Sequence, residues 1–111
     1  MLGSARAQSS DIGIIYVWNR WAYNALAQIG VFDDDNPYSI ANCTLQPQEW
    51  CSMTVPAGVH TVRAYDVNSK LLKEATGELK VGGWIKWCLS RNPEKDSECQ
   101  RWLYGKTLSP P

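Results

Sequence analysis

Four cysteines in two local pairs constrain this chain more than any other feature of its sequence. Cys43 stands close to Cys51, and Cys88 close to Cys99. The chain has no CxxC motif and a single histidine, His60, so the cysteines do not match a zinc-binding pattern. Their even number and local spacing instead favour the disulfides Cys43–Cys51 and Cys88–Cys99, formed in an oxidising compartment. Four cysteines allow three pairings, and four buried free thiols are the remaining alternative.

Short stretches of β-branched and aromatic residues, separated by turn residues, follow one another along the chain. Most of them alternate apolar and polar side chains, the pattern of strands with one buried face. The stretch 12–18 is apolar on both faces, which predicts a central strand. A short helix over 21–28 is the competing interpretation of the second stretch. Strands are predicted at 12–18, 25–32, 38–45, 49–55, 59–65, 70–75 and 78–89, with a break at Gly77 and a bulge at Gly82–Gly83. This spacing indicates an all-β fold: an antiparallel β-sandwich of about seven strands, Ig-like or prealbumin-like.

The stretch 38–66 has the most regular pattern and predicts three successive strands. Cys43 and Cys51 are equidistant from Pro47, and both fall on the apolar face of their strands. A simple hairpin about Pro47 would therefore place the two cysteines directly opposite each other, close enough for a disulfide. A second tight turn is predicted at 56–58, where Gly58 is free to take positive φ.

The two ends of the chain lack this alternation. Residues 1–10 include Ala5-Arg6-Ala7, a small-x-small pattern, so they are predicted to be a signal-peptide remnant or a disordered tail. Residues 11–111 are predicted to form a single domain that ends in an irregular tail clasped by the second cysteine pair. Within this tail, 100–104 offers either an eighth strand or one helical turn. No apolar run reaches transmembrane length. The expected disulfides and the small-x-small pattern favour the periplasm or the extracellular space as the location.

Charge and catalytic motifs exclude several classes of function. Lysine and arginine total 11 and aspartate and glutamate total 11, so no long-range field attracts nucleic acid. No catalytic signature is present, and we expect neither an enzyme nor a cofactor. His60 alternates with apolar residues, which favours a packed or rim histidine. Asp33 and Asp35 could offer oxygen ligands to calcium, but a solvated turn is the simpler interpretation.

Aromatic residues carry the main functional signal, since the chain has six tryptophans and five tyrosines against one phenylalanine. Packing against the core and the disulfides is expected to account for three or four of the tryptophans. Alternation places Trp50 opposite the cysteines, on the less buried face of its strand. The remainder could anchor a protein partner, because Trp, Tyr and Arg lead interface hot spots. The candidate binding residues are Arg20, Trp21, Tyr23, Trp50, Trp84 and Trp102.

The sequence Val55-Pro56-Ala57-Gly58-Val59-His60-Thr61-Val62 and the opening Ile14-Ile15-Tyr16-Val17-Trp18-Asn19-Arg20 carry a family resemblance. Over about residues 12–66 the chain resembles small bacterial envelope β-domains, the PEGA-like and uncharacterised lipoprotein-type sandwiches. Their pattern is V-x-P-G-x-H-x-V, and here Ala57 stands between the proline and the glycine. The resemblance implies an exported, non-enzymatic module with no shared catalytic residues.

These observations lead to one functional expectation and two alternatives. We expect a non-catalytic, exported protein-interaction module, an accessory or structural subunit of an envelope or extracellular assembly. One alternative is a small carbohydrate-binding module that uses exposed Trp and Tyr. The other is an inhibitor or immunity protein that acts through the 88–99 loop.

Overall fold

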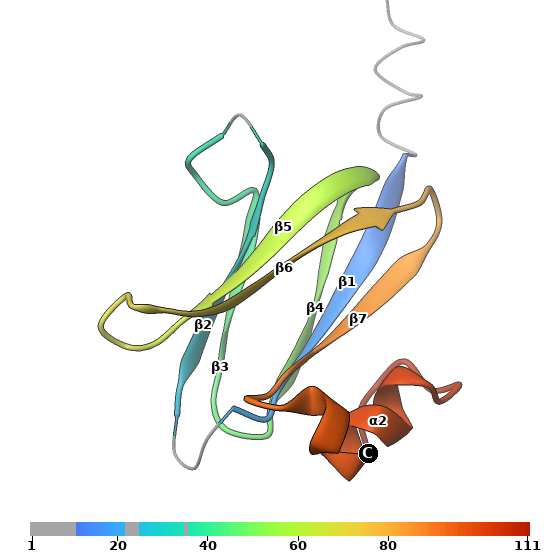
Figure 1. The fold of residues 1–111 in the computed structure, drawn as a ribbon. Coiled ribbons are helices and arrows are strands. Elements are labelled where there is room, and N and C mark those ends of the chain that lie inside the picture. Colours follow the sequence, from blue (N-terminus) through green and yellow to red (C-terminus); the bar gives the residue numbers. More distant parts are fainter. Residues whose placement is uncertain (1–10, 22–24, 35) are drawn as a thin grey trace, which may run out of the picture.

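The computed structural model describes residues 11–21, 25–34 and 36–111 (Figure 1). The described residues form seven strands, followed by a short 3-10 helix and one α-helix. The elements are β1 (Ile12–Asn19), β2 (Ala27–Phe32), β3 (Ala41–Leu45), β4 (Trp50–Pro56), β5 (Gly58–Tyr65), β6 (Leu71–Leu79), β7 (Trp84–Leu89), η1 (Pro93–Lys95) and α2 (Ser97–Leu103).

The strands form a three-stranded sheet in the order β4-β1-β7 and a four-stranded sheet in the order β3-β2-β5-β6. The inward-facing side chains of both sheets share one core cluster: Ile15, Val17, Met53, Val55 and Leu89 from the first sheet, and Ala27, Ile29, Val31, Leu45, Val62, Ala64 and Leu79 from the second. The predicted all-β sandwich is therefore confirmed. β1 is the central strand of its sheet, as its apolar character on both faces predicts.

Four of the five strand pairs in the described part of the chain are antiparallel, but β7 runs parallel to β1. A fully antiparallel arrangement was the expectation, and β7 departs from it because the chain changes sheet just before it. The turn after β6 delivers the chain to the starting end of β1, where Gly82 N donates to Ile12 O (2.7 Å) and Ile14 N donates to Gly83 O (3.0 Å). Both strands then leave from that end in the same direction.

Both predicted disulfides are present, but the first does not span a hairpin. Cys43 lies in β3 of the four-stranded sheet and Cys51 in β4 of the three-stranded sheet, so the bond joins the two sheets. The predicted hairpin about Pro47 is wrong. The segment between β3 and β4 crosses from sheet to sheet, through a turn in which Gln48 has a φ of 70°. Alternation determines that both cysteines face inward, but an inward-facing partner can lie on the neighbouring strand or on the opposite sheet.

The connection after β4 and the connection after β6 also change sheet, whereas β5 and β6 pair within one sheet. The predicted turn at 56–58 is a bend at Ala57 between β4 and β5, and Gly58 has a φ of 139°, which strongly favours glycine. The predicted break at Gly77 is wrong, because Gly77 pairs with His60 inside the continuous strand β6. The predicted bulge at Gly82–Gly83 is also wrong, since these glycines form the turn before β7. Long pairing with β5 keeps β6 extended through a residue that is a poor strand former.

The irregular tail packs against the outer side of the three-stranded sheet. Figure 1 shows α2 at the end of the sandwich where β1 and β7 finish. The disulfide Cys88–Cys99 ties α2 to β7, and the Asp96 carboxylate caps the helix by accepting from the N–H groups of Glu98 and Cys99. Of the two possibilities left open for 100–104, the helical one is realised. In the described ranges, no helix is long and apolar enough to cross a membrane.

Candidate functional site

The outer side of the three-stranded sheet carries most of the large side chains that the core does not use. β1 points Ile15 and Val17 into the core, so Ile14, Tyr16 and Trp18 point outward. Residues paired across neighbouring strands share a face, so each outward residue of β1 extends into a row. The rows are Thr54–Ile14–Trp84, Ser52–Tyr16–Lys86 and Trp50–Trp18–Cys88.

The third row is largely covered by the C-terminal tail. Trp102 of α2 packs edge-on against Trp18, with ring centroids 5.7 Å apart, and both side chains are buried. Cys88 and Cys99 complete this second cluster. Trp102 was predicted as a binding residue, and its burial removes it from the surface. Its position could not be recognised from the sequence, because the tail has no alternation that would show which side faces the sheet.

We call the two remaining rows together with Trp50 the aromatic face, which has seven residues. Trp50 is 42% exposed and Trp84 is 49% exposed. The strand register places them on opposite edge strands, at opposite ends of the rows. The buried Tyr16 lies between them and is 6.2 Å from Trp50 between ring centroids. Two of the predicted binding residues are therefore brought together on one surface.

Lys86 is the only charged residue of the aromatic face, and its ammonium group is engaged in contacts within the domain. Its Nζ donates to the backbone oxygens of Trp102 (2.7 Å) and Gly105 (3.2 Å), which close the end of α2. The same Nζ lies 5.3 Å from the ring centroid of Trp84. Burial lowers the pKa of Lys86 below its ordinary value. This lysine therefore holds the tail and one edge of Trp84 in place.

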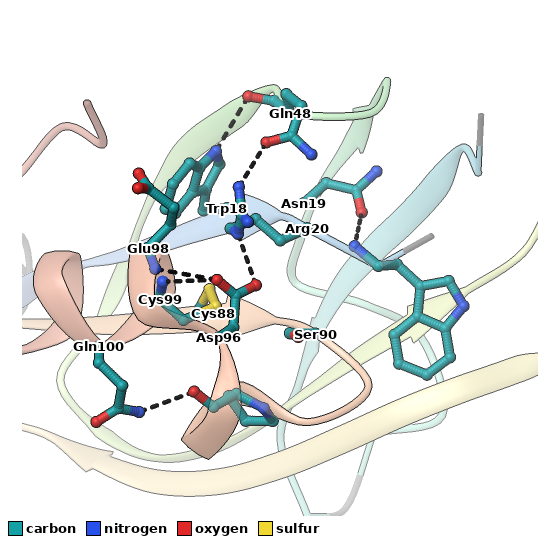
Figure 2. Close-up of a disulfide and its surroundings, with 12 residues drawn as sticks. Trp18, Asn19, Arg20, Gln48, Cys88, Ser90, Asp96, Glu98, Cys99 and Gln100 are labelled. Carbon is teal, nitrogen blue, oxygen red and sulfur yellow. Dashed lines mark hydrogen bonds and ion pairs between the residues drawn. A yellow bond between two sulfur atoms is a disulfide. The ribbon is translucent and has the colours of Figure 1, made fainter. Parts of the chain in front are cut away.

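Arg20 belongs to a structural clasp outside the aromatic face (Figure 2). Its Nε donates to Asp96 Oδ2 at 2.7 Å, its Nη1 donates to Gln48 Oε1 at 2.9 Å, and its guanidinium carbon lies 4.8 Å from the centroid of the Trp18 ring. Desolvation raises the pKa of Asp96, but the Arg20 hydrogen bond and charge, with the amides of Cys99 and Glu98, outweigh it and hold the pKa below its ordinary value. Arg20 thus joins the end of β1 to the cap of α2.

The other candidate residues of the β1–β2 connection also lie away from the aromatic face. Trp21 is half-buried and packs against the main core, and its backbone N–H donates to Asn19 Oδ1. Tyr23 lies outside the described residues. Asn19 was missed by sequence reasoning although it is 1% exposed; its amide donates to three backbone oxygens of the neighbouring connections. A polar residue at the end of an apolar strand is the only signal for it.

The segment between Cys88 and Cys99 is held against the domain at several points. The Arg91 guanidinium lies 5.2 Å from the centroid of the Trp21 ring. Asp96 is bound by Arg20, and Gln100 Nε2 donates to Pro93 O at 2.9 Å. These contacts give the segment a role in fastening α2, and an inhibitory wedge remains a prediction without an observation that favours it.

His60 is 4% exposed and packed between the end of β4 and the loop that follows β2. Its Nδ1 lies 2.5 Å from Asp33 Oδ1 and its Nε2 lies 2.5 Å from Pro56 O. Asp33 is thus engaged with the histidine, and Asp35 lies outside the described residues, so the calcium hypothesis stays a prediction. Within 11–21, 25–34 and 36–111, no group of three or more His, Cys, Asp or Glu side chains could hold a metal ion.

A scan against protein-family models and a search of curated proteins find no match to this chain. The resemblance to PEGA-like and lipoprotein-type domains therefore stays a prediction, and function is inferred from the geometry of the site alone.

Proposed function

We propose that this chain is a non-catalytic, exported protein-interaction domain that binds its partner through the aromatic face. Its role is that of an accessory or structural subunit in an envelope or extracellular assembly. The observation that carries the proposal is the exposure of Trp50 and Trp84 on one face of a three-stranded sheet. Exposed tryptophans of this kind dominate the binding energy of protein interfaces.

The composition of the aromatic face favours a protein partner over a glycan. Next to the tryptophans it has the aliphatic Ile14, and the neighbouring Ile12 is 40% exposed. Its exposed polar groups are the hydroxyls of Ser52 and Thr54, and it has no amide or carboxylate side chain. An apolar centre with a small polar rim and little free charge is typical of the core of a protein interface. The matching surface of the partner is expected to be apolar and uncharged.

Two further observations support an exported and non-catalytic role. Disulfides persist in oxidising compartments such as the periplasm and the extracellular space, and the chain forms two. The single imidazole, His60, is buried and has both ring nitrogens engaged, whereas a general base must reach the substrate.

The test is affinity capture from the native source with wild-type protein and two variants. Trp50→Ala/Trp84→Ala removes the exposed rings of the aromatic face. Tyr38→Ala is the matched control, since Tyr38 is 76% exposed and lies between β2 and β3 of the other sheet. Loss of about 2 kcal/mol per tryptophan corresponds to roughly 30-fold weaker binding for each.

The expected result is a partner that wild type and the tyrosine variant retain and that the tryptophan variant loses. Thermal melts of all three proteins check that each is folded. The proposal is wrong if the folded tryptophan variant retains the same partner with unchanged affinity.

A further inference from the structure

The outer side of the four-stranded sheet contains a hollow around Gly30, on the opposite face of the sandwich from the aromatic face. Strand pairing places Gly30 in a row between Asn42 and Arg63, next to a row formed by Thr44, Gln28 and Tyr65. Because Gly30 has no side chain while its neighbours do, the sheet surface dips at this point. The resulting hollow is shallow and has a volume of about 250 Å³.

The wall of the hollow beside Gly30 is the ring of Phe32. A Cβ built on Gly30 would lie 2.9 Å from Phe32 Cε2, so the ring reaches directly over the glycine. The Arg63 guanidinium lies 4.7 Å from the ring centroid, and Arg63 Nε also donates to Glu74 Oε1 at 2.9 Å. A second, neighbouring hollow is lined by both Phe32 and Arg63. Phe32 therefore borders both hollows. The Arg63 guanidinium is thereby engaged by Glu74 and packs against the Phe32 ring that forms the wall of the hollow.

Besides Gly30, Ile29 and Cys43, the remaining lining residues are polar and uncharged. Gln28 and Asn42 provide amides, and Thr44 and Tyr65 provide hydroxyls. The amide nitrogens donate hydrogen bonds within the domain: Gln28 Nε2 donates to Asp66 O, and Asn42 Nδ2 donates to Ser39 Oγ. In the part of the chain that the structure describes, their amide oxygens accept no hydrogen bond. Both therefore remain available as acceptors.

Neutral hydroxyls, amide oxygens and an aromatic wall match one class of ligand. A charged ligand would lose hydration without gaining a counter-charge, because no residue that lines this hollow is charged. A sugar ring offers many hydroxyl donors and an apolar face that packs against an aromatic ring. The volume is below the 300–1,000 Å³ of pockets for drug-sized ligands, which suits about one sugar unit.

We propose that the hollow at Gly30 binds a neutral saccharide. The sugar hydroxyls donate hydrogen bonds to the amide oxygens of Gln28 and Asn42, and the apolar face of the sugar ring packs against Phe32. Because this site and the aromatic face lie on opposite sides of the sandwich, the domain can hold a saccharide and a protein partner at once. The site is independent of the protein-binding proposal, and either can fail alone.

The test is a backbone-amide NMR titration with neutral sugars. The sugars are glucose, mannose, galactose and N-acetylglucosamine, as monosaccharides and as oligomers. Each is added to about 10 mM, a concentration at which even millimolar binding is visible. The proposal expects shifts at Gln28, Gly30 and Thr44, with affinity at least tenfold weaker in Gln28→Ala/Asn42→Ala. Asn92→Ala is the matched control, since Asn92 is an exposed amide without a capping bond and lies outside the hollow.

Gly30→Ala serves as an independent variant, because its Cβ would lie 2.9 Å from Phe32 Cε2 and force the ring to move. A thermal melt shows whether this variant is folded. Folded Gly30→Ala is expected to lose the shifts. No shift with any of these sugars, shifts confined to the aromatic face, or unchanged affinity in Gln28→Ala/Asn42→Ala would each overturn the proposal.

Discussion

Removal of the Asp96 carboxylate is expected to loosen the tail that closes one end of the aromatic face. Asp96 makes two kinds of contact: its Oδ1 caps α2, and its Oδ2 accepts from Arg20. Loss of a helix cap costs about 1 kcal/mol. The ion pair is partly buried, with side-chain exposures of 22% for Arg20 and 16% for Asp96. Because it is neither fully buried nor on the open surface, it contributes about 1 kcal/mol more. Asp96→Ala should therefore lower the free energy of unfolding by about 2 kcal/mol.

The substitution Asp96→Asn separates the two contributions. Asparagine caps helices as well as aspartate does, so this variant loses the ion pair and keeps the cap. It should cost about half as much as Asp96→Ala. Urea unfolding with intact disulfides, followed by tryptophan fluorescence, measures both losses. A loss below about 0.5 kcal/mol for Asp96→Ala, or equal losses for the two variants, would refute this assignment of contacts.

The same pair gives a pH dependence with a definite sign. The pKa of Asp96 is lower in the folded protein than its ordinary value of 3.8. Its contribution to stability is therefore fully present above pH 3.8 and is lost as the pH falls through the lower folded pKa. The difference in unfolding free energy between wild type and Asp96→Asn should be constant near neutral pH and should shrink in acid. A difference that grows as the pH falls would contradict the ion pair.

Two further predictions concern the sandwich itself. Cys43→Ala/Cys51→Ala should lower the free energy of unfolding by about 2.5 kcal/mol in a urea titration, because the disulfide closes a loop with a sequence separation of 8; an unchanged urea midpoint would contradict this. Gly13→Ala should lower the free energy of unfolding by about 1–3 kcal/mol, because its Cβ would lie 2.6 Å from Leu79 Cγ in the packed core. A Cβ on Gly77 would have more room, since its nearest atom is Ile85 Cδ1 at 3.9 Å. Gly77→Ala is therefore the matched control, and equal thermal melts for the two glycine variants would argue against the packing of β1 on β6.

The faces of the strands could be predicted from the sequence, but their assignment to sheets could not. Alternation has a period of two residues and reports which side chains face the core. It identified the inward positions of Cys43 and Cys51 and hence their pairing. It contains no information on whether the facing residue lies on a neighbouring strand or across the core. The four connections that change sheet, after β1, β3, β4 and β6, and the parallel strand β7 therefore had no local signal.

The candidate site was predictable to a similar extent. Trp50 was placed on the exposed face because its neighbours alternate clearly, and its 42% exposure agrees. Trp84 could not be related to Trp50 until β4 and β7 were known to flank β1. Trp102 is buried by a helix whose orientation depends on the Cys88–Cys99 bond, a contact between segments that no alternation describes. The hollow at Gly30 depends on the register of three strands, β3, β2 and β5, which is a property of the assembled sheet.

Site-specific photo-cross-linking tests most directly whether the aromatic face binds a protein. A photoreactive amino acid replaces Thr54, an exposed position on the β4 edge of that face, or Glu78, an exposed position on β6 of the other sheet. If the aromatic face is the interface, the Thr54 probe cross-links the captured partner and the Glu78 probe does not. Cross-linking of that partner by the Glu78 probe alone would contradict the proposed interface.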